Sequence, residues 1–287
     1  MKILVTGAGG FLGKELVNQL KGDHDLYCLA RSIKPDLPQD PHIHWIEMDL
    51  SAGLDLSKLP EKIDGIVHLA QSNGYRNFPA EADDVFAVNI ALTQALCNYG
   101  VKAGISRMVL ASTGTVYEPF IGVMAEANAV RPSGYYGASK LAAELISEAY
   151  SAQFSVCNMR IFFLYGPGQE NMLIARLIEN VKKGNKVSLP KDGEGLIFVP
   201  TFVGDTASAF KSALEDAWNG VYNIASPHQI SLGGLLRTIS KATGKPLNLE
   251  LTEASSPAPI VPDLDKIGEI LNLDQFLTPE QGIRKSI

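Results

Sequence analysis

The 287-residue sequence has only three cysteines and no paired cysteine spacing. Cys28, Cys97 and Cys157 each lie in an apolar run, which favours buried thiols in a reducing compartment over a disulfide framework, a zinc site or a redox pair. No apolar run reaches the roughly 18 residues that span a bilayer. The chain opens directly on the strand-like MKILVTG, so we expect a cytoplasmic protein without a signal peptide and without a membrane partner.

The sequence also lacks an excess of positive charge. Its net charge is −6, which argues against the basic face of a general nucleic-acid binder. Hydrophobic residues make up 46% and charged residues 20% of the chain, as in ordinary soluble globular proteins. This length suits one large α/β domain, or a domain with a smaller lobe.

Short runs rich in Val, Ile and Leu alternate with longer segments of helical periodicity. The predicted strands are 2–6, 26–30, 42–48, 65–70, 107–112 and 154–162, and the predicted helices between them are 11–20, 85–100 and 139–154. Several strands are apolar at nearly every position, which is typical of parallel strands buried on both faces. The alternation therefore predicts an α/β fold of the Rossmann type, with a doubly wound parallel sheet.

The alternation ends near residue 165. A turn at 166–169, a helix at 172–184, a loop leading into a helix at 198–214, a late strand at 221–226 and a proline-rich linker at 255–263 follow. We predict an NAD(P)-binding Rossmann domain of residues 1–165 plus about 196–226. Residues of about 166–195 plus 227–287 are predicted to form a smaller substrate-binding lobe over the carboxyl ends of the strands, where ligands bind in such sheets.

The first turn, TGAGGFLG at 6–13, spaces Gly7, Gly10 and Gly13 as G-x-x-G-x-x-G. Gly7 can leave the strand with a positive φ angle, Gly10 lets a pyrophosphate approach the backbone, and Gly13 lets the next helix pack closely. Phe11 and Leu12 open that helix, whose N-terminal N–H groups attract phosphate. A strand before the loop and a helix after it make a dinucleotide site the favoured interpretation.

The ends of the second and third strands bear on the choice of cofactor. No acidic residue follows the second strand to bind the ribose hydroxyls of NAD, and Arg31 stands there instead. Arg31 can pair with a 2′-phosphate, so NADP(H) is slightly favoured over NAD(H). Asp49 and Leu50 are predicted to flank the adenine.

A candidate catalytic set follows in the second half of this region. Tyr136 and Lys140 in YGASK are one helical turn apart, whereas the adjacent Tyr135 does not share that face with the lysine. A nearby cation would lower the phenol pKa from about 10 and prepare Tyr136 for acid–base work. Thr113 or Ser112, at the end of the fifth strand, would hold the substrate oxygen while a nicotinamide carries the hydride.

The sequence resembles the extended branch of the short-chain dehydrogenase/reductase family, the NAD-dependent sugar-nucleotide epimerases, dehydratases and ketoreductases. The resemblance is carried, in order, by TGAGGFLG (6–13), HLA (68–70), Asn89 in VNIALT, STGTVY (112–117), YGASK (136–140), Arg160 with YGPGQ (165–169), VGDTA (203–207) and YNIAS (222–226). It implies that Thr113, Tyr136 and Lys140 are catalytic. It also implies a homodimer formed through the 85–100 and 139–154 helices.

The same resemblance implies further cofactor contacts. Leu69, Ala70 and Gln71 would line the cofactor, together with Asn89, Tyr136 and Lys140. Residues 161–163, which include Phe162 and Phe163, would lie near the nicotinamide.

The sequence departs from the family pattern at several positions. Gly114 and Thr115 follow Thr113 where 4,6-dehydratases have an Asp-Glu pair, so dehydration is not expected. Phe163 replaces a common Asn that contacts the substrate diphosphate, and no arginine precedes VGD in 196–202 (LIFVPTF). Lys182, Lys183, Lys186, Arg176 or Arg237 could substitute, or could be solvated helix charges.

Three functions remain open on the sequence. The first is an NAD(P)-dependent sugar-nucleotide epimerase or 4-ketoreductase with a tyrosine acid/base. The second is an NADPH-dependent reductase of a small ketone or aldehyde without a nucleotide, which the apolar 196–199 and Phe163 favour. The third is a non-catalytic dinucleotide sensor, which would have no use for the Thr/Tyr/Lys set.

Overall fold

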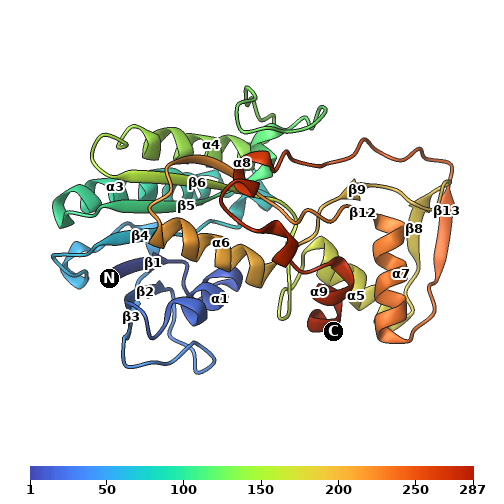
Figure 1. Cartoon of the computed structure of the whole chain (residues 1–287), viewed down its shortest axis with the longest axis horizontal. Coiled ribbons are helices and arrows are strands. Elements are labelled where there is room, and N and C mark those ends of the chain that lie inside the picture. The colour runs from blue at the N-terminus through green and yellow to red at the C-terminus, as the bar shows by residue number, and fades with distance from the viewer. The chain divides into compact units, whose positions relative to one another are not determined.

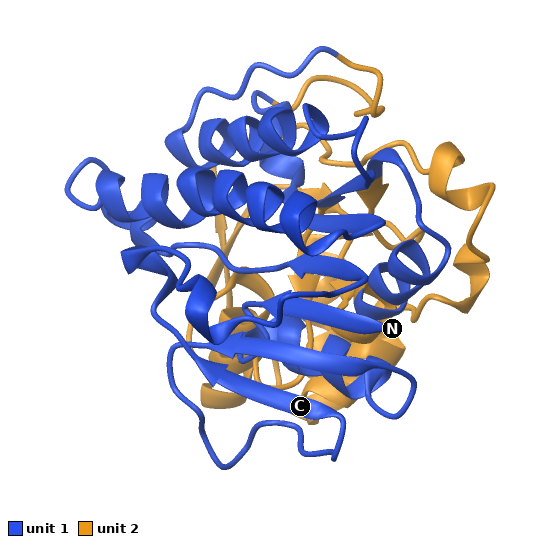
Figure 2. Cartoon of the chain, turned by 90° about the vertical axis from the view of Figure 1, so that its left-hand side faces the viewer, with its two compact units in different colours: residues 1–119, 129–160, 207–222 blue, residues 120–128, 161–206, 223–287 orange.

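A computed structural model describes residues 1–287, which form two compact units. The first unit comprises residues 1–119, 129–160 and 207–222, and the second comprises 120–128, 161–206 and 223–287 (Figure 2). The assignment of cofactor to the first unit and substrate to the second stays a prediction. None of the helices is both long enough and apolar enough to cross a membrane.

The first unit is built on a seven-stranded sheet with the order β11-β6-β5-β4-β1-β2-β3 (Figure 1). The strands are β1 Lys2–Thr6, β2 Asp25–Ala30, β3 Ile43–Glu47, β4 Gly65–His68, β5 Arg107–Thr113, β6 Ser155–Ile161 and β11 Gly220–Ile224. β1 pairs in parallel with β2 and β4, as do β2 with β3 and β4 with β5. The expected doubly wound sheet is confirmed, and its strand order reverses at β1, where such sheets bind ligands.

Helices lie on both faces of this sheet. Figure 1 shows α3 and α4 on one face and α1 and α6 on the other. The helices are α1 Phe11–Leu20, α2 Ala82–Val85, the π-helix η4 Phe86–Ala91, α3 Leu92–Ala103, α4 Tyr135–Glu148 and α6 Val203–Glu215. Short 3₁₀ turns occur at η1 Leu50–Ala52, η2 Leu56–Lys58, η3 Gly74–Asn77 and η5 Gly114–Tyr117.

Two predicted helices differ from the structure in their bounds. The single helix expected at 85–100 is divided into α2, η4 and α3, because a π-helical segment widens the turn around Asn89. The helix expected at 139–154 begins earlier, at Tyr135, after an extended Gly134, and ends at Glu148. Tyr136 and Lys140 are therefore both inside α4, as their spacing requires.

The core of the first unit packs between the sheet and the helices. Leu4, Ile66, Leu96 and Met108 are fully buried there and belong to one apolar cluster. All three cysteines are free and buried, as expected. This packing holds the carboxyl ends of β1, β4 and β5 in fixed positions.

The second unit contains three small strand pairs and several helices. Its elements are β7 Leu164–Tyr165, α5 Leu173–Lys183, β8 Val187–Pro190, β9 Ile197–Phe198, β10 Thr201–Phe202, β12 Ile230–Ser231, α7 Leu232–Thr243, β13 Leu249–Thr252, α8 Asp265–Gly268, η6 Leu273–Gln275 and α9 Pro279–Ser286. β7 pairs with β10, β8 with β13, and β9 with β12. Helix α7 packs against both α5 and α9.

Candidate active site

The glycine loop has the geometry that its sequence predicts. Gly7 has φ +69°, and a Cβ on it would lie 2.7 Å from the Ala70 backbone nitrogen. A Cβ on Gly13 would lie 2.1 Å from the Gly7 carbonyl oxygen, so only glycine lets α1 approach the turn this closely. Gly10 has an extended backbone at the start of α1, and its N–H donates to the Gly7 oxygen at 2.9 Å. Phe11 and Leu12 are the first two residues of α1.

The end of β4 lies directly beside this loop. The Leu69 N–H donates to the Thr6 carbonyl oxygen at 3.1 Å, and the Ala70 N–H donates to the Thr6 hydroxyl at 3.3 Å. The buried ring of His68 contacts the same hydroxyl through Nδ1 at 2.7 Å. Burial, with a smaller contribution from the charge of Lys140, lowers the pKa of His68 to about 3. The ring is therefore neutral and serves to orient Thr6.

Arg31 and Asp49 line one hollow at the ends of β2 and β3. This hollow has a volume of about 590 Å³, and Glu47 and Lys58 also line it. The Asp49 carboxylate accepts hydrogen bonds from the Ser51 N–H and hydroxyl, and these bonds, with the charge of Arg31, lower its pKa. Leu50 belongs to the buried core cluster and does not line this hollow. Its predicted place beside the adenine stays a prediction.

Thr113 and Tyr136 come together at the carboxyl end of β5, and Lys140 follows one helical turn further along α4. Thr113 is the last residue of β5, and Tyr136 and Lys140 lie on the first two turns of α4. The phenol of Tyr136 is hydrogen-bonded by Thr113 and donates to Oε1 of Gln71 at 3.0 Å. Lys140 is buried, with 3% of its surface exposed. These contacts join the ends of β4 and β5 to α4.

The predicted lowering of the phenol pKa is wrong. Burial raises the pKa of Tyr136 and Tyr75 raises it further, while the hydrogen bond from Thr113 and the charge of Arg76 only partly oppose this. Burial lowers the pKa of Lys140 to about 8, against the attraction of Glu144. Desolvation thus outweighs the neighbouring charges for both groups.

Two further aromatic rings stack on Tyr135 and Tyr136, and the sequence does not reveal these contacts. The ring of Tyr75, in η3, stacks on Tyr136 with a centroid distance of 4.3 Å. Phe78 stacks on Tyr135 at 4.6 Å, and the Tyr135 hydroxyl donates to the Ala82 carbonyl oxygen at 3.2 Å. Tyr135 is therefore a packing residue. The segment GYRNFP has no periodicity that would reveal these stacks.

Asn89 organises the site from within the π-helix η4. Its side chain is buried; its carbonyl oxygen accepts from the Ser72 N–H at 3.0 Å and its amide donates to the Ser139 hydroxyl at 2.9 Å. These bonds tie the turn after β4 to α4. In this structure Asn89 therefore supports both segments, and its predicted contact with the cofactor stays a prediction.

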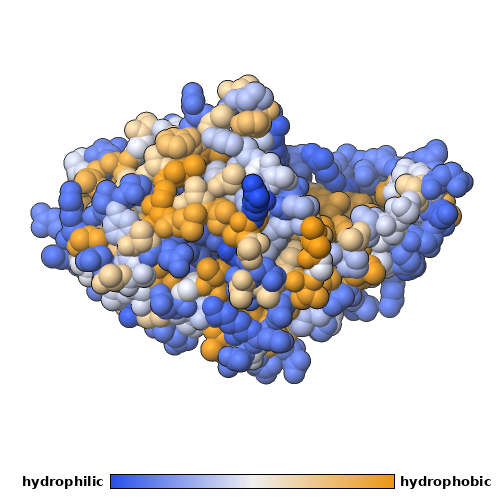
Figure 3. All heavy atoms as spheres, turned by 90° about the horizontal axis from the view of Figure 1, so that it is seen from above, coloured by the Kyte–Doolittle hydropathy of each residue, from blue (hydrophilic) through white to orange (hydrophobic).

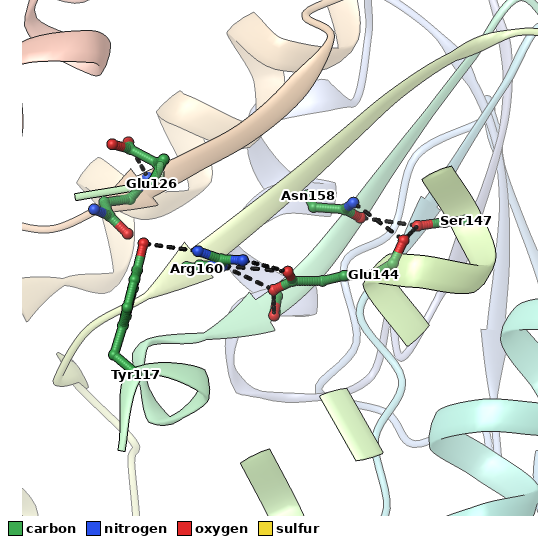
Figure 4. A network of polar contacts seen from close by, with 8 residues as sticks. Tyr117, Glu126, Glu144, Ser147, Asn158 and Arg160 are labelled. Atoms are coloured by element: carbon green, nitrogen blue, oxygen red, sulfur yellow. Dashed lines mark hydrogen bonds and ion pairs between the residues drawn. The ribbon is translucent and has the colours of Figure 1, made fainter. Parts of the chain in front are cut away.

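Thr113 and Ser112 face different surroundings, although both were candidates to hold the substrate oxygen. The Ser112 hydroxyl is buried and donates to the carboxylate of Glu144 (Figure 4 shows Glu144 with its Arg160 partner). Thr113 instead bonds to the N–H and hydroxyl of Thr115 and to Tyr136. Thr113 is therefore the hydroxyl beside the phenol.

Phe162 and Phe163 belong to the second unit. Phe162 is buried, and its N–H donates to the Ile224 carbonyl oxygen at 3.0 Å. Phe163 has φ +42°, a conformation that Asn adopts with less strain, and its ring meets Phe198 edge-on at 4.8 Å. Their predicted positions near the nicotinamide stay predictions.

The sheet and glycine loop define a dinucleotide-binding fold of the Rossmann class. The chain belongs to the NAD dependent epimerase/dehydratase family, whose model matches residues 3–225. The resemblance inferred from the motifs is thus confirmed.

Individual relatives cover nearly the whole chain. This chain is 27% identical to a Bacillus subtilis (strain 168) protein named as an uncharacterized UDP-glucose epimerase, YtcB. The match covers 100% of this chain and 97% of the relative. The structure of MoeE5 in complex with UDP-glucuronic acid and NAD is 29% identical in sequence, with a TM-score of 0.84. The match covers 100% of this chain and 97% of the MoeE5 chain. The structure of the UDP-glucuronic acid 4-epimerase from Bacillus cereus in complex with NAD is 25% identical in sequence, with a TM-score of 0.86. The match covers 100% of this chain and 95% of the epimerase chain.

Proposed function

We propose that this protein is an NAD(P)-dependent sugar-nucleotide epimerase or 4-ketoreductase that acts by hydride transfer at a sugar carbinol or ketone. The proposal is carried by one observation: Thr113 hydrogen-bonds Tyr136 at the sheet edge that also carries the glycine loop, and Lys140 follows one helical turn further along α4. The similar structures hold NAD, and one of them also holds UDP-glucuronic acid. These neighbours support a UDP-sugar as the substrate.

The residues of the first unit fit a dinucleotide. The glycine loop leaves no room for side chains at Gly7 or Gly13, and α1 presents its N-terminal N–H groups beyond Gly10. A bound nicotinamide cofactor supplies the hydride chemistry. Arg31 is exposed beside the hollow at the ends of β2 and β3, where we propose that it pairs with the 2′-phosphate of NADP(H). NAD(H), which the similar structures hold, is the alternative.

In the reductive direction the substrate ketone carbon gains a hydride and its oxygen gains a proton. A raised pKa keeps the phenol of Tyr136 protonated at neutral pH, so it can donate that proton. Thr113 holds the same oxygen through its hydroxyl, and the ammonium of Lys140 stabilises the phenolate that remains. In the oxidative direction, the first half of an epimerisation, these transfers run backwards.

Dehydration is not part of the proposal. Gly114, directly after Thr113, has no side chain, and the hydroxyl of Thr115 is bonded to Thr113. Neither position offers a carboxyl group to remove a proton or to protonate a leaving hydroxyl. Incubation with a UDP-hexose should therefore yield no 4-keto-6-deoxy product.

The second candidate function is an NADPH-dependent reductase of a small ketone or aldehyde. It is favoured by Phe163, which packs edge-on against Phe198 and cannot donate a hydrogen bond to a diphosphate through its side chain. Isothermal titration with UDP, dTDP and GDP separates the candidates, since a sugar-nucleotide enzyme should bind at least one of them.

The function is tested by incubating the full chain with NAD⁺ or NADPH and UDP-sugars, and following the sugar C4 configuration by proton NMR. The 4-epimer should accumulate, or a 4-keto sugar should be reduced with loss of absorbance at the nicotinamide band. Tyr135→Phe is the matched control, because Tyr135 packs on Phe78 outside the Thr113 contact and should keep its turnover. Absence of hydride transfer to or from any substrate would favour the third function, a non-catalytic dinucleotide sensor.

We further propose a homodimer through α3 and α4. Leu145 on α4 is 59% exposed, and Val101 on α3 is 43% exposed. Figure 3 views the side on which α3 and α4 lie and shows several apolar groups among polar ones. Sedimentation velocity should give twice the 30.9 kDa chain mass, and Leu145→Asp should shift it toward the monomer.

A further inference from the structure

A hollow in the second unit is lined by the turn after β7, by helix α5 and by Ser286 of α9. Its volume of about 300 Å³ is at the lower end of the range for small-molecule sites, and all of its lining residues belong to the second unit. It shares no lining residue with the hollow at Arg31, and none of the proposed catalytic residues lines it. This hollow is therefore separate from the cofactor and catalytic groups described above.

Two side-chain oxygens of this lining are buried and have no hydrogen-bond partner within the protein. They are the hydroxyl oxygen of Tyr165 and Oε1 of Gln169. The Gln169 Nε2 donates to the Leu164 carbonyl oxygen at 2.8 Å, which fixes the amide and leaves Oε1 as an acceptor. Because buried polar groups are nearly always hydrogen-bonded, two such oxygens in one lining indicate a site for a polar molecule.

The phenol of Tyr165 is fixed against α9. Tyr165 is 1% exposed, and its ring meets Phe202 edge-on with a centroid distance of 5.8 Å. A Cβ on Gly282 would overlap the hydroxyl oxygen, so only glycine leaves room for it there. Ser286 follows one helical turn later on α9 and lines the hollow. Burial, with the charge of Asp205, raises the pKa of Tyr165, so the hydroxyl is a neutral donor at neutral pH.

The α5 side of the lining divides into an apolar wall and a charged rim. Ile174 and Ile178 are buried, whereas Glu179, Lys182 and Lys183 further along the helix are exposed. Lys183 pairs with Glu179, and no acidic group pairs with Lys182. The rim therefore offers one uncompensated positive charge, while the interior offers hydrogen bonds without a charge.

We propose that this hollow binds a small anion that carries hydroxyl groups, with the charged group at Lys182 and the hydroxyls inside. A ligand hydroxyl suits both buried oxygens, because it can accept from Tyr165 and donate to Gln169. The charged group stays at the rim, since an anion among the buried isoleucines would lose its hydration without gaining an opposite charge. Ser286 donates its own proton to the Gly282 carbonyl oxygen at 2.8 Å, which leaves its oxygen as a further acceptor.

Isothermal titration of the full chain with four compounds tests this site. Glucose 6-phosphate and gluconate combine hydroxyls with a charge, whereas glucose lacks the charge and inorganic phosphate lacks the hydroxyls. At least one of the first two should bind about ten times more tightly than glucose or phosphate. Binding of glucose 6-phosphate alone would identify a phosphate ligand, and binding of gluconate alone would identify a carboxylate. In isoleucine-methyl NMR the bound compound should shift the signals of Ile174 and Ile178 and leave Ile3, in β1, unchanged.

Two substitutions locate the binding. Tyr165→Phe removes the donor and should weaken the bound compound by about three- to tenfold, and it should fold because it removes no hydrogen bond within the protein. Lys182→Gln removes the rim charge and should weaken binding by about threefold or more at low salt, with a smaller difference at high salt. Lys245→Gln is the matched control, because Lys245 is an exposed lysine of the same unit that does not line the hollow, and its affinity should equal that of the parent.

Three results would overturn the inference. If none of the four compounds binds, the hollow holds water only. If glucose binds as tightly as glucose 6-phosphate and gluconate, the ligand needs no charge. If the affinity is unchanged in Tyr165→Phe or in Lys182→Gln, the compound binds elsewhere. Because the titrations need no turnover and the site does not rest on the proposed function, failure of that function would leave these results readable.

Discussion

Replacing Gly13 by alanine tests the glycine loop at its tightest point. The added Cβ would lie 2.1 Å from the Gly7 carbonyl oxygen and 2.7 Å from both Cα and the carbonyl oxygen of Ala8. All three are backbone atoms, so no side chain can rotate away to make room. Helix α1 would have to move back from the turn by about 1 Å or more to restore a normal contact.

The change in the free energy of unfolding caused by Gly13→Ala combines two opposing effects. Overpacking a rigid site costs about 1–3 kcal/mol, and the severity of this overlap places Gly13→Ala at the upper end. Alanine regains up to about 1 kcal/mol, because Gly13 is a helical position in α1. The net loss is about 2 kcal/mol, which lowers the melting temperature by about 4–8 °C in a protein of this size. Displacing the first turn of α1 should also weaken NADH binding by about tenfold or more.

Thermal unfolding and isothermal titration with NADH measure the two effects. Gly9→Ala is the control within the same loop, because its Cβ would meet only the Ala30 and Leu37 side chains, at 3.4 and 3.5 Å, which are ordinary contact distances. The melting temperature of Gly9→Ala and its affinity for NADH should equal those of the parent protein within experimental error. The reasoning is refuted if Gly13→Ala matches the parent in both assays, or if Gly9→Ala loses as much.

Three further substitutions test other parts of the account. Arg31→Ala should weaken NADPH about tenfold or more and leave NADH unchanged; equal losses for both cofactors would contradict a 2′-phosphate contact. His68, with its folded pKa of about 3, binds fewer protons than its unfolded form near pH 5. The contribution of His68 to the free energy of unfolding is therefore complete above about pH 6.5, and below that pH it falls by roughly 1.4 kcal/mol per pH unit. In urea unfolding, His68→Asn should reduce this dependence of stability on pH. Tyr165→Phe removes a buried hydroxyl without a hydrogen-bond partner, so it should raise stability by about 1 kcal/mol; a loss would show that the hydroxyl is satisfied.

The sheet and the glycine loop could be predicted because their signals are local. Alternating apolar strands and amphipathic helices identify β1 to β6 and α1, and the glycine spacing in TGAGGFLG requires the close approach that Gly7 and Gly13 make. The capping box that starts α9 was also readable. Thr278 and Gln281 form it, with Pro279 at the first helical position.

The remaining features depend on long-range packing. The stack of Tyr75 on Tyr136 joins residues 61 positions apart, and no local pattern predicts it. The direction of the Tyr136 pKa shift was wrong, because spacing alone shows that a lysine is near but not how deeply both groups are buried. The partnership of Glu144 with Arg160 likewise appears only when α4 and β6 pack together.

The central claim is that Tyr136 exchanges a proton with a sugar oxygen while a nicotinamide carries the hydride. The most direct measurement uses UDP-glucuronic acid deuterated at C4, the sugar nucleotide held by a similar solved structure, with NAD⁺ and either the parent or Tyr136→Phe. The account predicts that the parent forms a C4 epimer that retains the deuterium, and that Tyr136→Phe binds NAD⁺ normally but turns over about 10²–10⁴ times more slowly. Full turnover by Tyr136→Phe, or loss of the deuterium to water, would contradict it.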